Sequence, residues 1–357
     1  MHIPTSQRSQ LQRSLIRSHA ASSGDEVEAE VMRGTALLRL RTLATGRTGV
    51  RPRTAQAYAD LLNAGITPVV REYGWLGCSG DLAPLAHVAL AVMGEGEVRT
   101  ESGLLPAATA LAEAGLEPVE LVEKEGLALI NGTDGMLAML MLACADLARL
   151  LQTAHLTAAM SLEVLLGTDR TLAADVVGLR PHPGQAAAAA NMRRLLQGSA
   201  VVASHRGPGG HPGAGRVQPA VRAAVAGAVR DTLAHCCAVA AREAASAIDN
   251  PALLDDGRIE SNGHFHGAPV AYALDFYAVA ISDVASMSER RTDRLLDRTR
   301  SHGLPPFLAH DPGVDSGLMI AQYTRAALVS ELKRLAVPAS VDSIPSSAMQ
   351  ENHVSMG

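Results

Sequence analysis

Four long stretches of the chain repeat apolar residues at intervals of three and four, which is the period of an α-helix. They cover residues 26–44, 133–166, 219–247 and 269–298. Alanine and leucine favour helices and dominate the chain, whereas strand-like alternation is scarce and aromatic residues make up only 3% of the sequence. The last two stretches are apolar around most of their circumference, so we expect burial on several sides. The sequence therefore predicts a mainly α fold built as a bundle of long helices.

Composition excludes several classes of partner. The 31 basic and 36 acidic residues give a net charge of −5, which provides no general attraction for nucleic acid. No stretch of about eighteen uninterrupted apolar residues is present, so we expect no membrane span. The first residues are polar and contain no apolar core of a signal peptide, which predicts a cytoplasmic protein. Cysteines 78, 144, 236 and 237 have neither metal-ligand nor disulfide-framework spacing, so we expect free thiols and no metal.

Local signals mark ends and loops. Residues 22–25 carry the residue types of a helix start, and Asp249-Asn250-Pro251 predicts a helix stop. Residues 288–300 interleave arginines with acidic residues at helical spacing, which is typical of a salt-bridged helix face. Residues 205–215 and 262–269 are too rich in glycine, proline or polar residues for either helix or strand. On a helical scaffold, such loops are where binding residues tend to lie.

The segment Gly77-Cys78-Ser79-Gly80-Asp81 is the most distinctive chemical motif. Small residues flank a serine, and a helix is expected to follow, with Asp81 suited to its N-cap. Gly80 has no side chain to keep its amide nitrogen from the Cys78 carbonyl, and Ser79 can lose its hydroxyl as water to leave a methylidene. Two dehydrations would give a cyclic electrophile. Taken alone, the motif is more simply an ordinary turn at a helix start.

The surrounding sequence changes that interpretation. Residues 61–97 closely resemble the segment of the histidine ammonia-lyase family that forms 4-methylideneimidazol-5-one from an Ala-Ser-Gly triad. Here Cys78 replaces the alanine, which contributes only its backbone carbonyl to the ring, and Trp75 replaces a serine. Further blocks of the family follow along nearly the whole chain, including KEGLALINGT (124–133), GHFHG (263–267) and PASVDSIPSSAMQENHVSMG (338–357).

The resemblance implies a fold, an activity and site residues. The fold is the aspartase/fumarase-like architecture of long helices, assembled as a homotetramer with active sites shared between subunits. The activity is non-oxidative loss of ammonia from an amino acid, with an electrophile that forms autocatalytically and no metal. By position in the matching blocks, the resemblance assigns catalysis to Cys78, Ser79, Gly80, Asn131 and Gln218, and substrate binding to His19, Arg222, Phe265 and Glu351.

His19 and Glu351 indicate the substrate. In this family, Ser-His and Gln-Glu pairs such as Ser18-His19 and Gln350-Glu351 mark the members that act on L-histidine and release urocanate. Both side chains offer hydrogen bonds and charge to an imidazole and would suit a phenyl ring poorly. Arg222 is the candidate for pairing with the substrate carboxylate, although the segment after Gln218 is shorter than in the family.

We expect one lyase domain over residues 1–357, without the family's N-terminal tyrosine loop and C-terminal helical region. Two alternatives stay open. One is a phenylalanine or tyrosine ammonia-lyase or aminomutase with the same prosthetic group. The other is a catalytically inactive homologue or scaffold subunit that keeps the helical oligomer.

Overall fold

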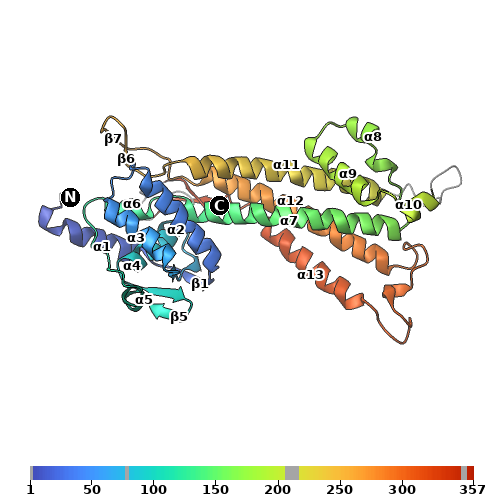
Figure 1. The fold of residues 1–357 in the computed structure, drawn as a ribbon, viewed down its shortest axis with the longest axis horizontal. Helices are drawn as coiled ribbons and strands as arrows, with labels where there is room; N and C mark the ends of the chain where they lie inside the picture. The colour runs from blue at the N-terminus through green and yellow to red at the C-terminus, as the bar shows by residue number, and fades with distance from the viewer. Residues whose placement is uncertain (1–2, 77–79, 206–216, 347–351) are drawn as a thin grey trace. The chain divides into compact units, whose positions relative to one another are not determined.

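The computed structural model describes residues 3–76, 80–205, 217–346 and 352–357, and the side chains of residues 217–221 lie outside the description. The described chain divides into two compact units, coloured by residue number in Figure 1. Unit 1 comprises residues 1–142, 238–273 and 338–357, and unit 2 comprises residues 143–237 and 274–337. Each unit is therefore built from stretches that are far apart in the sequence. The prediction of a single domain stays a prediction.

Unit 1 has a core of short helices packed on one another. Ile16, Met32, Tyr58 and Leu85 are fully buried in it and come from α1, α2, α3 and α4. Burial of such side chains is the main source of stability for a core of this kind. The helices are α1 (Arg8–His19), α2 (Ala29–Ala44), α3 (Pro52–Asn63), α4 (Leu82–Val92), α5 (Ala107–Glu113) and α6 (Glu125–Ile130), after a 3-10 turn η1 (Thr5–Gln7).

Small antiparallel sheets connect these helices. The strand β2 (Thr67–Pro68) pairs with β4 (Glu97–Thr100), which pairs with β5 (Gly103–Pro106). The strand β1 (Ser23–Glu26) pairs with β3 (Arg71–Tyr73), so the helix start predicted at residues 22–25 is wrong. Pairing with β3 extends these residues, and the helix begins only at Ala29. The other pairs are β6 (Ala252–Leu253) with β7 (Ile259–Glu260), and β8 (Ser343–Ile344) with β9 (Val354–Ser355).

Three long helices, α7 (Asp134–Val164), α11 (Val217–Ala245) and α12 (Ala268–Leu296), match three of the predicted helical stretches closely. In unit 2 they pack together, because Arg222 of α11 donates to the Ala158 carbonyl of α7 and Tyr277 of α12 donates to the Ala143 carbonyl of α7 (Figure 1). The mainly α prediction is confirmed. The remaining elements of unit 2 are η2 (Arg170–Leu172), α8 (Ala174–Gly178), α9 (Pro183–Leu195), α10 (Ala200–Ser204), η3 (Pro306–Leu308) and α13 (Met319–Leu335).

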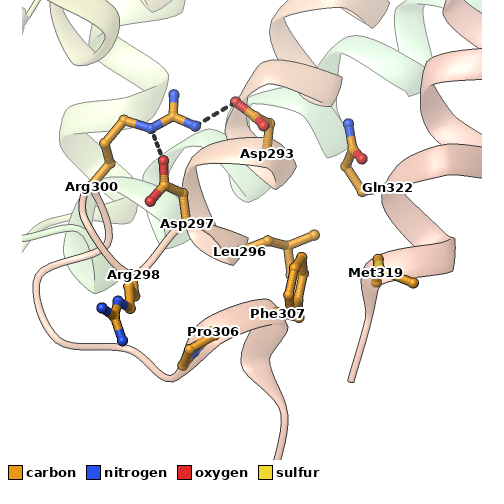
Figure 2. A pocket seen from close by; sticks show the side chains of 9 residues that line it. All are labelled: Asp293, Leu296, Asp297, Arg298, Arg300, Pro306, Phe307, Met319 and Gln322. Carbon is orange, nitrogen blue, oxygen red and sulfur yellow. Dashed lines mark hydrogen bonds and ion pairs between the residues drawn. The ribbon is translucent and has the colours of Figure 1, made fainter. Parts of the chain in front are cut away.

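The arginine-rich stretch forms ion pairs, but the predicted helix face stops short, because α12 ends at Leu296 and Asp297 and Arg300 lie in the turn after it. Arg300 reaches back to Asp293 at 2.9 Å and also contacts Asp297, as Figure 2 shows beside a pocket that Phe307 and Met319 line. Exposed pairs of this kind contribute little stability individually. Not every arginine of the stretch is on the exposed face, because Arg291 is only 8% exposed.

Within the described residues, three helical segments are long and apolar enough to cross a membrane by length and composition alone. Polar residues interrupt each of the three segments, so none of them contains eighteen uninterrupted apolar residues. In the first segment, 72% of the apolar window is buried inside the protein. The expectation of no membrane span stays a prediction. The segments are Glu125–Val164, Arg222–Ala245 and Ala268–Leu296.

Candidate active site

Gly80, the last residue of the candidate triad, lies directly against the backbone of Gly132. Its φ of +72° is in the left-handed region, and a Cβ at this position would lie 1.8 Å from the Gly132 carbonyl oxygen. The next amide, that of Asp81, donates to the same oxygen at 2.6 Å. Only glycine fits both the conformation and the close approach. The backbone that follows Ser79 is thus fixed beside the Asn131-Gly132 turn.

The carboxylate of Asp81 is 2% exposed and accepts hydrogen bonds from the Gly135 amide at 2.6 Å and the Met136 amide at 3.1 Å. These amides belong to the first turn of α7, where unpaired N–H groups favour an acceptor. The expected side-chain cap on the helix that follows Asp81 is absent, since Asp81 caps α7 instead. Burial raises the pKa of Asp81 to about 7, against the opposing effect of the two amide hydrogen bonds.

Asn131 directly follows α6 as its C-cap residue and is 5% exposed. Its side-chain Nδ2 donates to the Asn250 carbonyl at 3.0 Å and to Asp249 Oδ1 at 3.3 Å. Two partners of this kind fix the orientation of the amide, since its NH₂ group can only donate. The structure therefore brings Asn131 and Gly80 together. It also places Asn131 against Asp249 and Asn250, which the sequence predicts only as a helix stop.

A buried arginine supports this turn. Arg39 of α2 is 0% exposed and donates to the Asn131 carbonyl and to Asp134 Oδ2, each at 3.0 Å, and to the Ile248 carbonyl at 3.0 Å. A Cβ on Gly132 would lie 2.2 Å from Arg39 Nη1, so a side chain here would push the Arg39 guanidinium away from its partners. Burial raises the pKa of Asp134, while the Arg39 guanidinium lowers it.

Asp249 is also fully buried and forms an ion pair with Lys124. Burial lowers the pKa of Lys124, although the Asp249 carboxylate opposes this shift. None of Arg39, Lys124 and Asp249 is among the site residues predicted from the sequence. A signal for Arg39 exists, because it lies three and seven residues from the buried Ala36 and Met32, on the apolar face of its helix.

A pocket formed by the end of α11 and the loop before α12 lies in the same unit. Its lining includes Glu243, Ile248, His264 and His266. Burial and the nearby Asp134 charge raise the pKa of Glu243. The glycines and histidines of this loop predict binding residues here. Its candidate Phe265 is half-buried, and the two histidines beside it line the pocket.

His19 lies at the C-terminus of α1 and is half-buried. Its Nδ1 is 2.8 Å from the Leu15 carbonyl oxygen and 3.1 Å from Ser18 Oγ. A carbonyl can only accept, so Nδ1 carries the hydrogen and Nε2 of the neutral ring is an acceptor. This arrangement leaves His19 able to receive a hydrogen bond from an imidazole N–H.

Arg222 belongs to unit 2, is 3% exposed and donates from Nη1 to the Ala158 carbonyl at 2.8 Å. Gln218 belongs to α11, but its side chain lies outside the description, as do Cys78, Ser79 and Glu351. The predicted roles of all five stay predictions. No group of three or more potential metal ligands occurs among the described residues.

Comparison with known proteins identifies the family. Residues 1–357 match the family described as aromatic amino acid lyase. The chain belongs to the aromatic amino acid lyase family. The membership predicted from the residues around Gly80 is thus confirmed, and so is the prediction that the chain is a lyase.

Similar proteins are named for histidine. The chain is 65% identical to histidine ammonia-lyase of Streptomyces avermitilis, covering 100% of this chain and 70% of that protein. It is 51% identical to histidine ammonia-lyase of Deinococcus radiodurans, covering 100% of this chain and 68% of that protein. Both relatives are named histidine ammonia-lyase, which confirms the prediction of this activity.

Solved structures confirm the helical aspartase/fumarase-like fold class. Histidine ammonia-lyase from Trypanosoma cruzi superposes with a TM-score of 0.89 at 39% identity, covering 99% of this chain and 66% of that chain. Tyrosine aminomutase from Streptomyces globisporus superposes with a TM-score of 0.92 at 38% identity, covering 100% of this chain and 70% of that chain. This chain therefore spans about two thirds to 70% of the length of these proteins.

Proposed function

We propose that the chain eliminates ammonia from L-histidine to give urocanate, with 4-methylideneimidazol-5-one formed from Cys78, Ser79 and Gly80 as its prosthetic group. The observation that carries this proposal is the turn at Gly80, packed against Gly132 and next to the fixed amide of Asn131. The names of the relatives favour histidine over the other amino acids of the family.

The described residues fit this prosthetic group. Ring closure requires the amide nitrogen of Gly80 to attack the carbonyl carbon of Cys78, and two water molecules leave, one of them with the Ser79 hydroxyl. A side chain at residue 80 would strike the Gly132 carbonyl, and the left-handed φ of Gly80 bends the backbone there. The hydrogen bond from the Asp81 amide to Gly132 holds the turn in this bent form.

The prosthetic group supplies an electrophile that makes the loss of the amino group possible. The chain's own residues orient the groups around the reacting atoms. The carboxylate of Asp249 and the carbonyl of Asn250 orient the Asn131 amide, and Arg39 holds the Asn131 carbonyl from the other side. A fixed dipole needs no reorganisation during reaction, which is how enzymes stabilise developing charge. Asn131 is thus a candidate catalytic residue, and Arg39 is a positioning residue.

Histidine specificity is assigned to His19 and Glu351. His19 Nε2 is an acceptor in the neutral ring, because Nδ1 bonds the Leu15 carbonyl. A carboxylate such as that of Glu351 can accept from, or pair with, a substrate imidazole. Phe265 is proposed as an aromatic wall and Gln218 as a polar contact of the same reaction.

We also propose a homotetramer in the cytoplasm, with L-histidine as the small-molecule partner and without nucleic acid or membrane partners. The assembly into a tetramer is supported by apolar side chains that are exposed in the single chain. On α12 these include Tyr272 at 61% and Val279 at 50%, and on α13 Ile320 at 61% and Tyr323 at 57%. Apolar surface of this kind is typical of faces covered by a further subunit.

Turnover of L-histidine, L-tyrosine and L-phenylalanine by the purified chain tests this proposal. We expect urocanate from histidine, followed by its ultraviolet absorbance, and no turnover by a Ser79→Ala variant. Product from tyrosine or phenylalanine alone would reassign the chain to the other branch of the family. Absence of turnover, together with normal assembly, would favour an inactive scaffold subunit.

A further inference from the structure

A small cavity lies inside unit 2, where α7, α9, α11 and α12 meet. Its polar lining consists of Arg222, Arg291 and His155, each less than 9% exposed. Apolar side chains complete the wall; several of them are only half-buried, so the cavity opens partly to solvent. The lining residues that share this apolar character are Ala154, Ala158, Met192, Val225, Ala226, Val284 and Met287.

The hydrogen-bond donors of this cavity are only partly used. Nη1 of Arg222 donates to the Ala158 carbonyl, but its Nε and Nη2 atoms are buried and have no hydrogen-bond partner within the described residues. Nε2 of His155 is also buried without a hydrogen-bond partner within the described residues, and a ring nitrogen of this kind can donate or accept. Arg291 donates from Nη2 to Thr157 Oγ1 at 3.2 Å. A buried N–H group without an acceptor costs about 1–3 kcal/mol, and more when it belongs to a charged group.

The charges that act on these groups are cations. Arg222 is influenced by Arg291 and Arg294, and Arg291 by Arg325, all of which disfavour a further positive charge. Burial, followed by this repulsion, lowers the pKa of Arg222 to about 10. Arg222 and Arg291 have no ion pair among the described residues. The segments outside the description contain a single acidic side chain, Glu351. A buried guanidinium without a carboxylate is the situation in which a bound anion is most favourable.

We propose that this cavity binds a small monovalent anion of the halide class, for which chloride is the natural ligand, between Arg222 and Arg291. The volume of the cavity is ≈ 20 Å³, which is room for about one water-sized occupant. Sulfate, phosphate and an amino acid are too large. The anion accepts hydrogen bonds from the free N–H groups of Arg222, and its negative charge offsets the repulsion between the arginines.

Binding in this cavity goes beyond the lyase reaction, since all of its residues belong to unit 2. It gives Arg222 a role in holding α7, α11 and α12 together, whereas the substrate-carboxylate contact anticipated from the sequence stays an untested prediction. A ligand that binds only the folded state raises the melting temperature in a saturable way. The inference therefore predicts a chloride-dependent Tm.

The experiment compares the Tm of the purified chain in sodium chloride and in sodium gluconate at constant ionic strength, because gluconate is too large for the cavity. We expect the Tm to rise with chloride and to saturate, and bromide to act like chloride. An Arg222→Met variant should lose this dependence. An Arg149→Met variant, whose arginine is 80% exposed on α7, should keep it.

Bromide anomalous scattering from crystals of the unmodified chain gives a readout that needs no variant. A peak between Arg222 and Arg291 would support the proposal. No peak, or an unchanged chloride dependence in Arg222→Met, would overturn it. A Tm that depends on protein concentration but not on halide would also overturn it, because an acceptor from a second copy of the chain would then satisfy Arg222. None of these outcomes depends on histidine turnover.

Discussion

Replacement of Arg39 by methionine tests the support beneath Asn131. The substitution keeps a long apolar stem but removes the three hydrogen bonds to Asn131, Asp134 and Ile248. It also leaves the carboxylate of Asp134, which is 6% exposed, without its cation. Removing one partner of a buried ion pair costs about 3–5 kcal/mol, because the other charge stays buried and unpaired. At about 2 °C per kcal/mol in a chain of this length, the Tm should fall by about 6–10 °C.

Differential scanning fluorimetry at neutral pH measures this change. Arg33→Met is the matched control, since Arg33 is exposed on the same helix and should give a change of about 1 °C or less. The double variant Arg39→Met with Asp134→Gln removes the stranded charge and should recover roughly half of the loss. If Arg39→Met lowers the Tm by less than about 2 °C, Arg39 does not support the turn as described. The same conclusion holds if the double variant is no more stable than Arg39→Met alone.

Two further substitutions examine the neighbouring turn. Asp81→Asn should flatten the pH dependence of stability, because a folded-state pKa of about 7 means that the folded chain holds a proton that the unfolded chain releases near its ordinary value of 3.8. The stability from this proton is fully present below pH 3.8 and is lost as the pH rises through about 7. Identical Tm profiles from pH 4 to 8 for the unmodified chain and Asp81→Asn would contradict the raised pKa of Asp81. Gly80→Ala should lower the Tm and keep the mass unmodified, since its Cβ would lie 1.8 Å from the Gly132 oxygen. Gly65→Ala is its control, with a φ of +69° and no atom within 4 Å, and it should show only the strain of the left-handed backbone, about 1–2 kcal/mol.

The long helices could be predicted from the sequence because their signal is periodic and local. The apolar spacing at residues 133–166 and 269–298 corresponds to α7 and α12 within two residues at each end. Residues 22–25 could not be predicted correctly in this way. Their serines, glycine and aspartate favour a helix start locally, but pairing with Arg71 and Tyr73, almost fifty residues later, makes them a strand.

The site residues also fall into those that a local sequence pattern predicts and those that it does not. Asn131 and Gly80 were found because they lie in recognisable motifs. Arg39 and Asp249 were missed as functional residues because their importance comes from burial and from partners that are distant in the sequence, which no local pattern records. The side chain of Asp81 was assigned to the wrong helix, since its capping partner begins more than fifty residues later.

Intact-mass measurement of the purified chain tests the central claim most directly. If Cys78, Ser79 and Gly80 form 4-methylideneimidazol-5-one, the chain is lighter by two water molecules than its sequence requires, and Ser79→Ala abolishes the difference. We expect this loss of mass in the unmodified sequence. A mass equal to that of the unmodified polypeptide would contradict the proposal that this chain carries the electrophile of an ammonia-lyase.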